Sequence, residues 1–179
     1  MNRNEILNNF YQNYCDEDTR LDPKHRQLEF FTTDRYVQKY LKPGCRIIEI
    51  GAGTGKYSLY YAKQGYQVNS IEYVKHNLDV LKSKITPDMN IEAEQGDAVD
   101  LSRFEDNTFD VVLVLGPLYH LYDEKDIKQA IKEAIRVSKR FIIITVPSKE
   151  DNNPEHIHLL TKDILTSIFN EHGITNLKF

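Results

Sequence analysis

An apolar run that leads directly into alternating glycines restricts the fold of this chain more than any other feature. Residues 47–55 read Ile-Ile-Glu-Ile-Gly-Ala-Gly-Thr-Gly, and residues 56–63 have the pattern of a helix. The run predicts a buried strand, and the glycines predict a tight turn into the helix. Glycines let a backbone come close to a ligand, and the N-terminus of a helix offers unpaired N–H groups to an anion. The sequence therefore predicts a nucleotide-cofactor site at this turn.

Three glycine-rich patterns can be compared with the turn. The dinucleotide pattern G-x-G-x-x-G fails because the third glycine, Gly55, comes one residue early. The phosphate loop G-x-x-x-x-G-K-[ST] fails because only three residues separate Gly51 from Gly55 and because Tyr57 replaces the hydroxyl residue. The pattern E-x-G-x-G-x-G matches Glu49, Gly51, Gly53 and Gly55 without a gap. A tight connection that binds no ligand is the alternative interpretation.

The composition is that of one globular domain. The chain has 179 residues, of which 40% are hydrophobic and 28% charged. No apolar run is long enough to cross a membrane, residues 1–5 lack the apolar core of a signal peptide, and the only cysteines are Cys15 and Cys45. We therefore expect a cytoplasmic protein without disulfides or membrane partners. The net charge of −4 argues against a broad nucleic-acid-binding surface.

Strand and helix patterns alternate after the turn. Strands are predicted at 45–50, 67–72, 91–95, 109–115 and 141–146, with the opening of a sixth at 174–179. The alternation predicts an α/β fold of the Rossmann-like, doubly wound kind, with a mostly parallel sheet and helices on both faces. We expect residues 1–41 to form an N-terminal helical lid and residues 42–179 to form the cofactor-binding domain. One helix, with Asp123 as its N-terminal cap, carries a basic face that we expect to be solvated: Lys125, Lys128, Lys132 and Arg136.

Acidic residues stand at the ends of successive predicted strands. Glu72 ends the second strand and Asp97 follows the third. Because the carboxyl ends of parallel strands meet at one sheet edge, we expect both carboxylates near the glycine turn. Glu72 can accept hydrogen bonds from the hydroxyls of a ribose, and Asp97 can accept a hydrogen bond from an amino group of adenine. Each could instead be a solvated strand end or a turn residue, but their joint placement favours a site.

The span from about residue 35 to residue 146 resembles a class I S-adenosylmethionine-dependent methyltransferase of the small-molecule, type 11 kind. The matching segments are IIEIGAGTG, SIEYV, EQGDAVDL and FDVVLVLGPLYHL. The resemblance implies S-adenosyl-L-methionine as the cofactor and a small molecule as the methyl acceptor. The cofactor-binding residues that it implies are Glu49, Gly51, Ala52, Gly53, Thr54, Gly55, Glu72, Tyr73, Asp97, Ala98 and Leu115.

The resemblance also implies a role for each part of this set. Glu49 and the turn shape the pocket for the methionine end of the cofactor, Glu72 binds the ribose, and Asp97 binds the adenine. Leu115 closes the site under the sulfonium. The cofactor is cationic and has no phosphate, so carboxylates around the turn suit it better than they would suit a dinucleotide.

Two residues after the fourth strand are candidates for catalysis. Methyl transfer is an in-line displacement, so the enzyme mainly aligns the nucleophile and excludes water. His120 is the candidate base if the nucleophile arrives protonated, and Tyr119 is the candidate positioning group. Packing is the alternative interpretation of His120. The motif [ND]-P-P-[YF] of amino-methylating enzymes is absent, because Gly116 and Leu118 stand at two of its positions. An RNA methyltransferase and a non-catalytic cofactor-binding domain are the alternative functions.

Three further expectations concern the two ends of the chain. Phe10, Tyr11 and Tyr14 could form an aromatic lid over the pocket, but for Phe10 we favour ordinary packing of a helix on the sheet. Two histidines in residues 154–158 invite a metal interpretation, but a third ligand is not evident, so we expect a structural loop and no metal. The family sheet has seven strands, whereas this sequence ends near the start of the sixth. We therefore predict a six-strand sheet without the last antiparallel strand, in either a truncated chain or a fold completed otherwise. We expect the free edge of the fifth strand to be covered either by the last segment of the chain or by a second chain in a homodimer.

Overall fold

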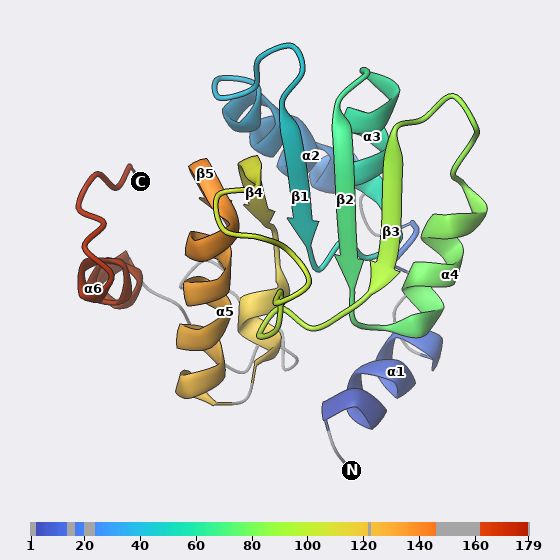
Figure 1. The fold of residues 1–179 in the computed structure, drawn as a ribbon. Coiled ribbons are helices and arrows are strands. Elements are labelled where there is room, and N and C mark those ends of the chain that lie inside the picture. The colour runs from blue at the N-terminus through green and yellow to red at the C-terminus, as the bar shows by residue number, and fades with distance from the viewer. Residues whose placement is uncertain (1–2, 14–16, 20–23, 122, 146–161, 179) are drawn as a thin grey trace.

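Strands and helices alternate along the chain, as the periodicity of the apolar residues predicts (Figure 1). The computed structural model describes residues 3–13, 17–19, 24–121, 123–145 and 162–178. The strands are β1 Arg46–Ile50, β2 Gln67–Glu72, β3 Ile91–Gln95, β4 Phe109–Val114 and β5 Ser138–Ile144. The helices are α1 Arg3–Asn13, α2 Lys24–Val37, α3 Lys56–Lys63, α4 Lys75–Ser83, the 3-10 helix η1 Pro117–His120, α5 Glu124–Val137 and α6 Lys162–Glu171.

The five strands form one parallel sheet in the order β3-β2-β1-β4-β5. The chain runs outward from β1 to β3, returns to β4 on the other side of β1, and then adds β5. This reversal makes the sheet doubly wound, so the predicted Rossmann-like fold class is confirmed. It also places the switch point between β1 and β4, where the loops that follow these strands diverge and leave room for a ligand.

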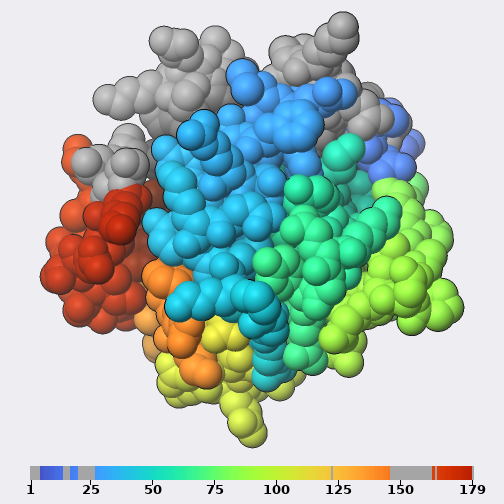
Figure 2. Space-filling view, turned by 90° about the horizontal axis from the view of Figure 1, so that it is seen from above, coloured from blue at the N-terminus to red at the C-terminus, as the bar shows by residue number. Residues whose placement is uncertain are grey.

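Apolar side chains cover both faces of the sheet. On one face, Ile47, Val68 and Val111 pack in a cluster that also contains Tyr57 and Tyr61 of α3. Helix α2 lies on the same side: the ring of Phe30 stacks on Tyr57 at 4.9 Å between centroids. Figure 2 shows α2 and the residues after it between α3 on one side and β5 with α6 on the other.

The opposite face of the sheet packs against α5 and α6. Its cluster joins Ile48 and Val112 of the sheet to Ile127 and Ile131 of α5 and to Phe169 of α6. Because both faces are covered, the central strands consist almost wholly of buried residues, as a parallel sheet requires.

The predicted sixth strand does not form in the described residues, so the six-strand prediction is wrong for them. After α6, Gly173 adopts φ 73° and the Ile174 amide donates back to the Phe169 carbonyl at 3.0 Å. That bond ends the helix and turns the Ile174 amide away from the edge of β5. Ile174 and Leu177 instead pack against the α5 side of the core. β5 therefore lies at an edge of the sheet, and the predicted homodimer stays a prediction.

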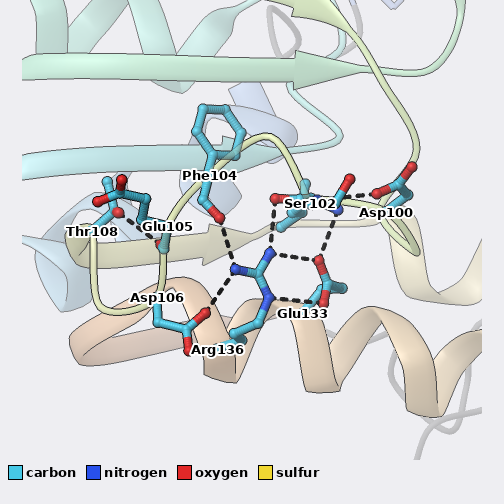
Figure 3. Close-up of polar contacts among 9 residues, drawn as sticks. Asp100, Ser102, Phe104, Glu105, Asp106, Thr108, Glu133 and Arg136 are labelled. Carbon is cyan, nitrogen blue, oxygen red and sulfur yellow. Dashed lines mark hydrogen bonds and ion pairs between the residues drawn. The ribbon is translucent and has the colours of Figure 1, made fainter.

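Two smaller expectations also change. Asp123 does precede α5, but its side chain makes no cap bond. Its backbone carbonyl instead accepts from the amides of Asp126 and Ile127. Arg136 does not face solvent: it donates to both carboxylate oxygens of Glu133 at 3.0 and 2.8 Å and to the carbonyls of Leu101 and Phe104 (Figure 3). The side chain therefore ties α5 to the connection between β3 and β4.

Candidate active site

The glycine turn after β1 requires its glycines for both conformation and space. Gly51, Gly53 and Gly55 have φ of 75°, 56° and 88°, a region that side chains disfavour. A Cβ on Gly51 would lie 2.9 Å from Cβ of Pro117, and one on Gly55 would lie 2.7 Å from Cγ of Leu81. The turn is therefore wedged between η1 and α4, directly beyond the carboxyl end of β1.

Glu72 at the end of β2 is bonded to this turn. Its Oε2 accepts from the Gly53 amide at 2.7 Å and its Oε1 accepts from the Val74 amide at 2.8 Å. The residue is 5% exposed, and burial raises the pKa of its carboxyl to about 7 despite these bonds. A carboxylate has about four acceptor positions, and the amides of Gly53 and Val74 fill two of them, so the bonds already present do not exclude a ribose contact. The ribose role stays a prediction.

Glu49 on β1 lies deeper. It is 2% exposed, and burial raises the pKa of its carboxyl to about 8. The Ser58 hydroxyl of α3 donates to Oε2 of Glu49, and the Ser70 hydroxyl of β2 donates to Ser58 at 2.8 Å. Ser58 and Ser70 were missed by the sequence analysis. The sequence of β2, Gln-Val-Asn-Ser-Ile-Glu, contains several polar residues, so its pattern does not single out Ser70.

The third strand end lies beside the second. The Gly96 amide donates to the Glu72 carbonyl at 3.1 Å, and the Gln95 side chain donates to the Tyr73 carbonyl at 3.0 Å. Asp97 is half-buried and its Oδ1 accepts from the Val99 amide at 3.3 Å, the geometry of a turn carboxylate. The fold thus brings the predicted residues of three strand ends to one edge of the sheet. The roles of Tyr73, Asp97 and Ala98 toward a cofactor stay predictions.

The two candidates for catalysis lie in η1, against the glycine turn. Gly116 has φ 136°, and a Cβ there would lie 2.8 Å from the hydroxyl of Tyr119. The rings of Tyr119 and His120 are 4.9 Å apart. Nε2 of His120 is 3.4 Å from the hydroxyl of Tyr11 on α1, a long hydrogen bond. Leu115 is half-buried beside the α3 cluster.

Comparison with known proteins identifies the domain. The profile of the family described as Methyltransferase domain matches residues 48–141, more than half of the chain. The chain belongs to the methyltransferase domain family. The predicted resemblance to class I S-adenosylmethionine-dependent methyltransferases is confirmed.

Two curated relatives match the central part of this methyltransferase domain. Demethylmenaquinone methyltransferase of Renibacterium salmoninarum is 36% identical over 97 residues, which are 54% of this chain and 38% of that protein. Cypemycin N-terminal methyltransferase of a Streptomyces species is 34% identical over 92 residues, which are 51% of this chain and 36% of that protein. The matched parts thus amount to well under half the length of these relatives.

Solved structures share the fold. A SAM-dependent methyltransferase from Methanosarcina mazei superposes with a TM-score of 0.54 at 31% identity, covering 58% of this chain and 52% of that one. Magnesium protoporphyrin IX methyltransferase from Synechocystis PCC 6803, solved with bound SAM, has a TM-score of 0.76 at 17% identity and covers 97% of this chain and 86% of that one. At that identity the second likeness shows the fold alone.

The N-terminal segment of the methyltransferase domain covers the same sheet edge. Helix α1 lies beyond the arrowheads of the strands in Figure 1 and packs against α4. Tyr11 reaches His120, and Phe10 meets the Tyr11 ring edge-on at 5.1 Å. Glu17 lies over the glycine turn: its Cγ would be 3.2 Å from a Cβ on Gly53. The sequence analysis missed Glu17, because nothing in its local pattern links it to Gly53.

Several expectations are not tested by these observations. Tyr14 and residues 154–158, with their two histidines, lie outside the described residues. The domain boundary at residue 41 and the cytoplasmic location stay predictions. None of the described helices has the length and apolar character that crossing a bilayer requires.

Proposed function

We propose that this chain is an S-adenosylmethionine-dependent methyltransferase that acts on a small-molecule acceptor. The observation that carries the proposal is the buried carboxylate of Glu72, bonded to the Gly53 amide at the glycine turn. A pyrophosphate at this turn would meet that negative charge, whereas an adenosine compound that is cationic and free of phosphate would be attracted to it. Membership of residues 48–141 in the methyltransferase domain family supports the same conclusion.

S-adenosylmethionine would supply an activated methyl group on a sulfonium, which is already a good leaving group. The chain's own residues then bind and orient. The backbone of 51–55 and the N-terminus of α3 would hold the methionine carboxylate, because their amides and the helix dipole favour an anion. Glu72 would accept hydrogen bonds from the ribose hydroxyls. Asp97 and the Ala98 backbone would bind the adenine, and Leu115 would border the sulfonium.

The acceptor is expected on the side of η1. His120 and Tyr119 lie in η1 beside the turn, and the Tyr11 hydroxyl reaches His120 from α1. His120 accepts a proton from the nucleophile if the acceptor arrives protonated. The rings of Tyr11 and Tyr119 offer the half-buried aromatic walls that suit an organic small molecule. The relative named for demethylmenaquinone supports this class of acceptor.

Calorimetry and a transfer screen test the proposal. The purified chain is titrated with S-adenosylmethionine and with S-adenosylhomocysteine, and is then incubated with methyl-labelled cofactor and either a metabolite extract or total RNA. We expect binding of both ligands and label in the small-molecule fraction. Label in the RNA fraction would show that the acceptor is a nucleic acid and would contradict the proposal of a small-molecule acceptor. Binding without transfer to either fraction would favour a non-catalytic domain, and failure to bind either ligand would refute the proposed function.

A further inference from the structure

A carboxylate from the N-terminal segment stands at the glycine turn, outside the part of the chain that matches the family. The profile match begins at residue 48, whereas Glu17 lies thirty-one positions earlier, 48 minus 17. Cγ and Oε1 of Glu17 lie 3.2 and 3.4 Å from the position of a Cβ on Gly53. The amide of Gly53 also donates a hydrogen bond to the Glu72 carboxylate. The Glu17 carboxylate is therefore in contact with the centre of the proposed cofactor site.

Three carboxylates share this place, and they differ in accessibility. Glu49 is 2% exposed and Glu72 is 5% exposed, while Glu17 is only half-buried. Glu17 is therefore the most exposed of the three carboxylates at the turn.

A neighbouring ion pair sets the position of Glu17. Asp18 pairs with Lys84 just after α4, and Nζ of Lys84 also donates to the Thr54 carbonyl in the turn at 3.2 Å. The bond from Lys84 lowers the pKa of the Asp18 carboxyl. The segment that carries Glu17 is thus fastened to the turn itself by the residue next to it.

The amino-acid end of S-adenosylmethionine carries an ammonium group beside its carboxylate. The amides of the turn and of the α3 N-terminus suit the carboxylate, but they offer nothing to a cation. A carbonyl or a carboxylate can accept from an ammonium group, and a carboxylate beside Gly53 is the stronger acceptor because charge-assisted hydrogen bonds are the strong ones. Building on the proposed function, we infer that Glu17 binds the α-ammonium group of the cofactor and so selects ligands that carry the amino-acid end.

Three adenosine ligands separate this role from a general one. S-adenosylmethionine and S-adenosylhomocysteine both carry the ammonium group, but only the first has the sulfonium charge. 5′-Methylthioadenosine keeps the adenosine and the sulfur and lacks the amino acid altogether. For Glu17→Gln we expect the dissociation constants of the first two ligands to rise about tenfold, with that of 5′-methylthioadenosine unchanged. Glu17→Asp, which keeps the charge on a shorter side chain, should restore part of the affinity.

Matched variants and the wild type make the result decisive. Glu105→Gln removes one negative charge from an exposed side chain in the connection between β3 and β4, and should leave all three affinities unchanged. Unaltered binding of the amino-acid ligands by Glu17→Gln, tighter binding by it, or equal weakening for all three ligands would each overturn the inference. If the wild-type chain binds neither S-adenosylmethionine nor S-adenosylhomocysteine, the proposed function itself fails. Thermal unfolding of each variant confirms that it is folded.

Discussion

At the scale of single residues, the main feature of this domain is that ionisable groups lie where water cannot reach them. Glu49 and Glu72 are nearly fully buried, and their carboxyl pKa values rise to about 8 and about 7 because burial disfavours the charged form. Shifted pKa values of this kind cluster at functional sites, and a cationic ligand would supply the missing counter-charge here. Without that ligand, the ionised carboxylates weaken the fold.

The pKa of Glu49 gives a stability prediction with a definite sign. The ordinary value is 4.5 and the folded value is about 8, so between these pH values the folded state keeps a proton that the unfolded state has lost. Stability therefore falls as pH rises through this window. Glu49→Gln cannot ionise and its carbonyl can still accept from Ser58. We expect the variant to melt about 5–10 °C above the wild type at pH 9 and close to it at pH 5.

Differential scanning fluorimetry across this pH range measures the effect of Glu49→Gln. Glu105→Gln, a change at an exposed carboxyl, serves as the control and should follow the wild-type curve. A constant difference between Glu49→Gln and the wild type at every pH would show that the Glu49 carboxyl does not titrate in this window.

His120 gives a kinetic prediction at the same scale. If it takes the proton of the acceptor, His120→Ala lowers kcat about 10²- to 10⁴-fold, because general base catalysis typically contributes that much. The dissociation constant of S-adenosylmethionine stays the same, since His120 lies on the η1 side of the turn. His76→Ala, at an exposed position of α4, is the matched control. Unchanged turnover of the true acceptor by His120→Ala would remove His120 from the mechanism.

At the scale of elements, the strand-to-helix turn depends on how closely α4 approaches it. Gly55 and Gly65 have nearly the same φ, 88° and 87°, but a Cβ on Gly55 meets Leu81 at 2.7 Å and one on Gly65 meets nothing within 4 Å. Gly65→Ala therefore measures the cost of the left-handed backbone alone. We expect Gly55→Ala to lose about 1–3 kcal/mol more than Gly65→Ala in urea unfolding, because Leu81 is fully buried and must move. Equal losses in the free energy of unfolding for the two variants would mean that the Leu81 side chain can move aside without cost.

The link between α5 and the β3–β4 connection is a second element-scale feature. Figure 3 shows the Arg136 guanidinium between the Glu133 carboxylate, the Phe104 carbonyl and Asp106. The Glu133 side chain is 10% exposed, and its carboxylate also accepts from the Leu101 amide at 2.9 Å. The pair therefore holds the connection to the helix together with two backbone bonds, from the amides of Asn107 and Thr108 to the carbonyls of Arg136 and Val137.

Removal of Arg136 should be costly for that reason. Arg136→Met leaves the buried Glu133 carboxylate without its cation, and we expect a loss of about 2–4 kcal/mol in the free energy of unfolding. Lys132→Met, on the same helix but exposed, should change it by less than about 0.5 kcal/mol. The double variant Glu133→Gln, Arg136→Met should recover part of the loss if the unpaired charge is the cause. Additive losses in the double variant would argue against that cause.

At the scale of the whole molecule, the proposed cofactor site joins segments that are far apart in the sequence. The ends of β1, β2 and β3, η1 and the N-terminal segment all meet at one sheet edge. A ligand held there binds the folded state alone and raises its stability by mass action. S-adenosylmethionine at about a hundred times its dissociation constant should raise the melting temperature by about 5–10 °C. ATP at the same concentration should not, because its phosphates meet the carboxylates, and a larger shift with ATP would contradict the proposed site.

By itself, the sequence determined the order in which strands and helices follow one another along the chain. It also determined the glycine turn and the acidic residues at the strand ends. These depend on periodicity and on the spacing of Gly51, Gly53 and Gly55, which are local properties. The family followed from the same residues. The sixth strand expected at 174–178 shows what the sequence did not determine. A segment forms a strand only where its amides can pair with the edge of a sheet, and the Ile174 amide is already bonded to the Phe169 carbonyl.

Only the tertiary structure decided which side chains meet. Glu17 reaches Gly53 and Tyr11 reaches His120 across segments far apart in the chain, and Ser58 of α3 bonds Glu49 of β1. It also decided that Arg136 closes a loop instead of facing water. The physical reason is that the environment of a side chain depends on the packing of distant elements, and a local pattern carries no record of that packing.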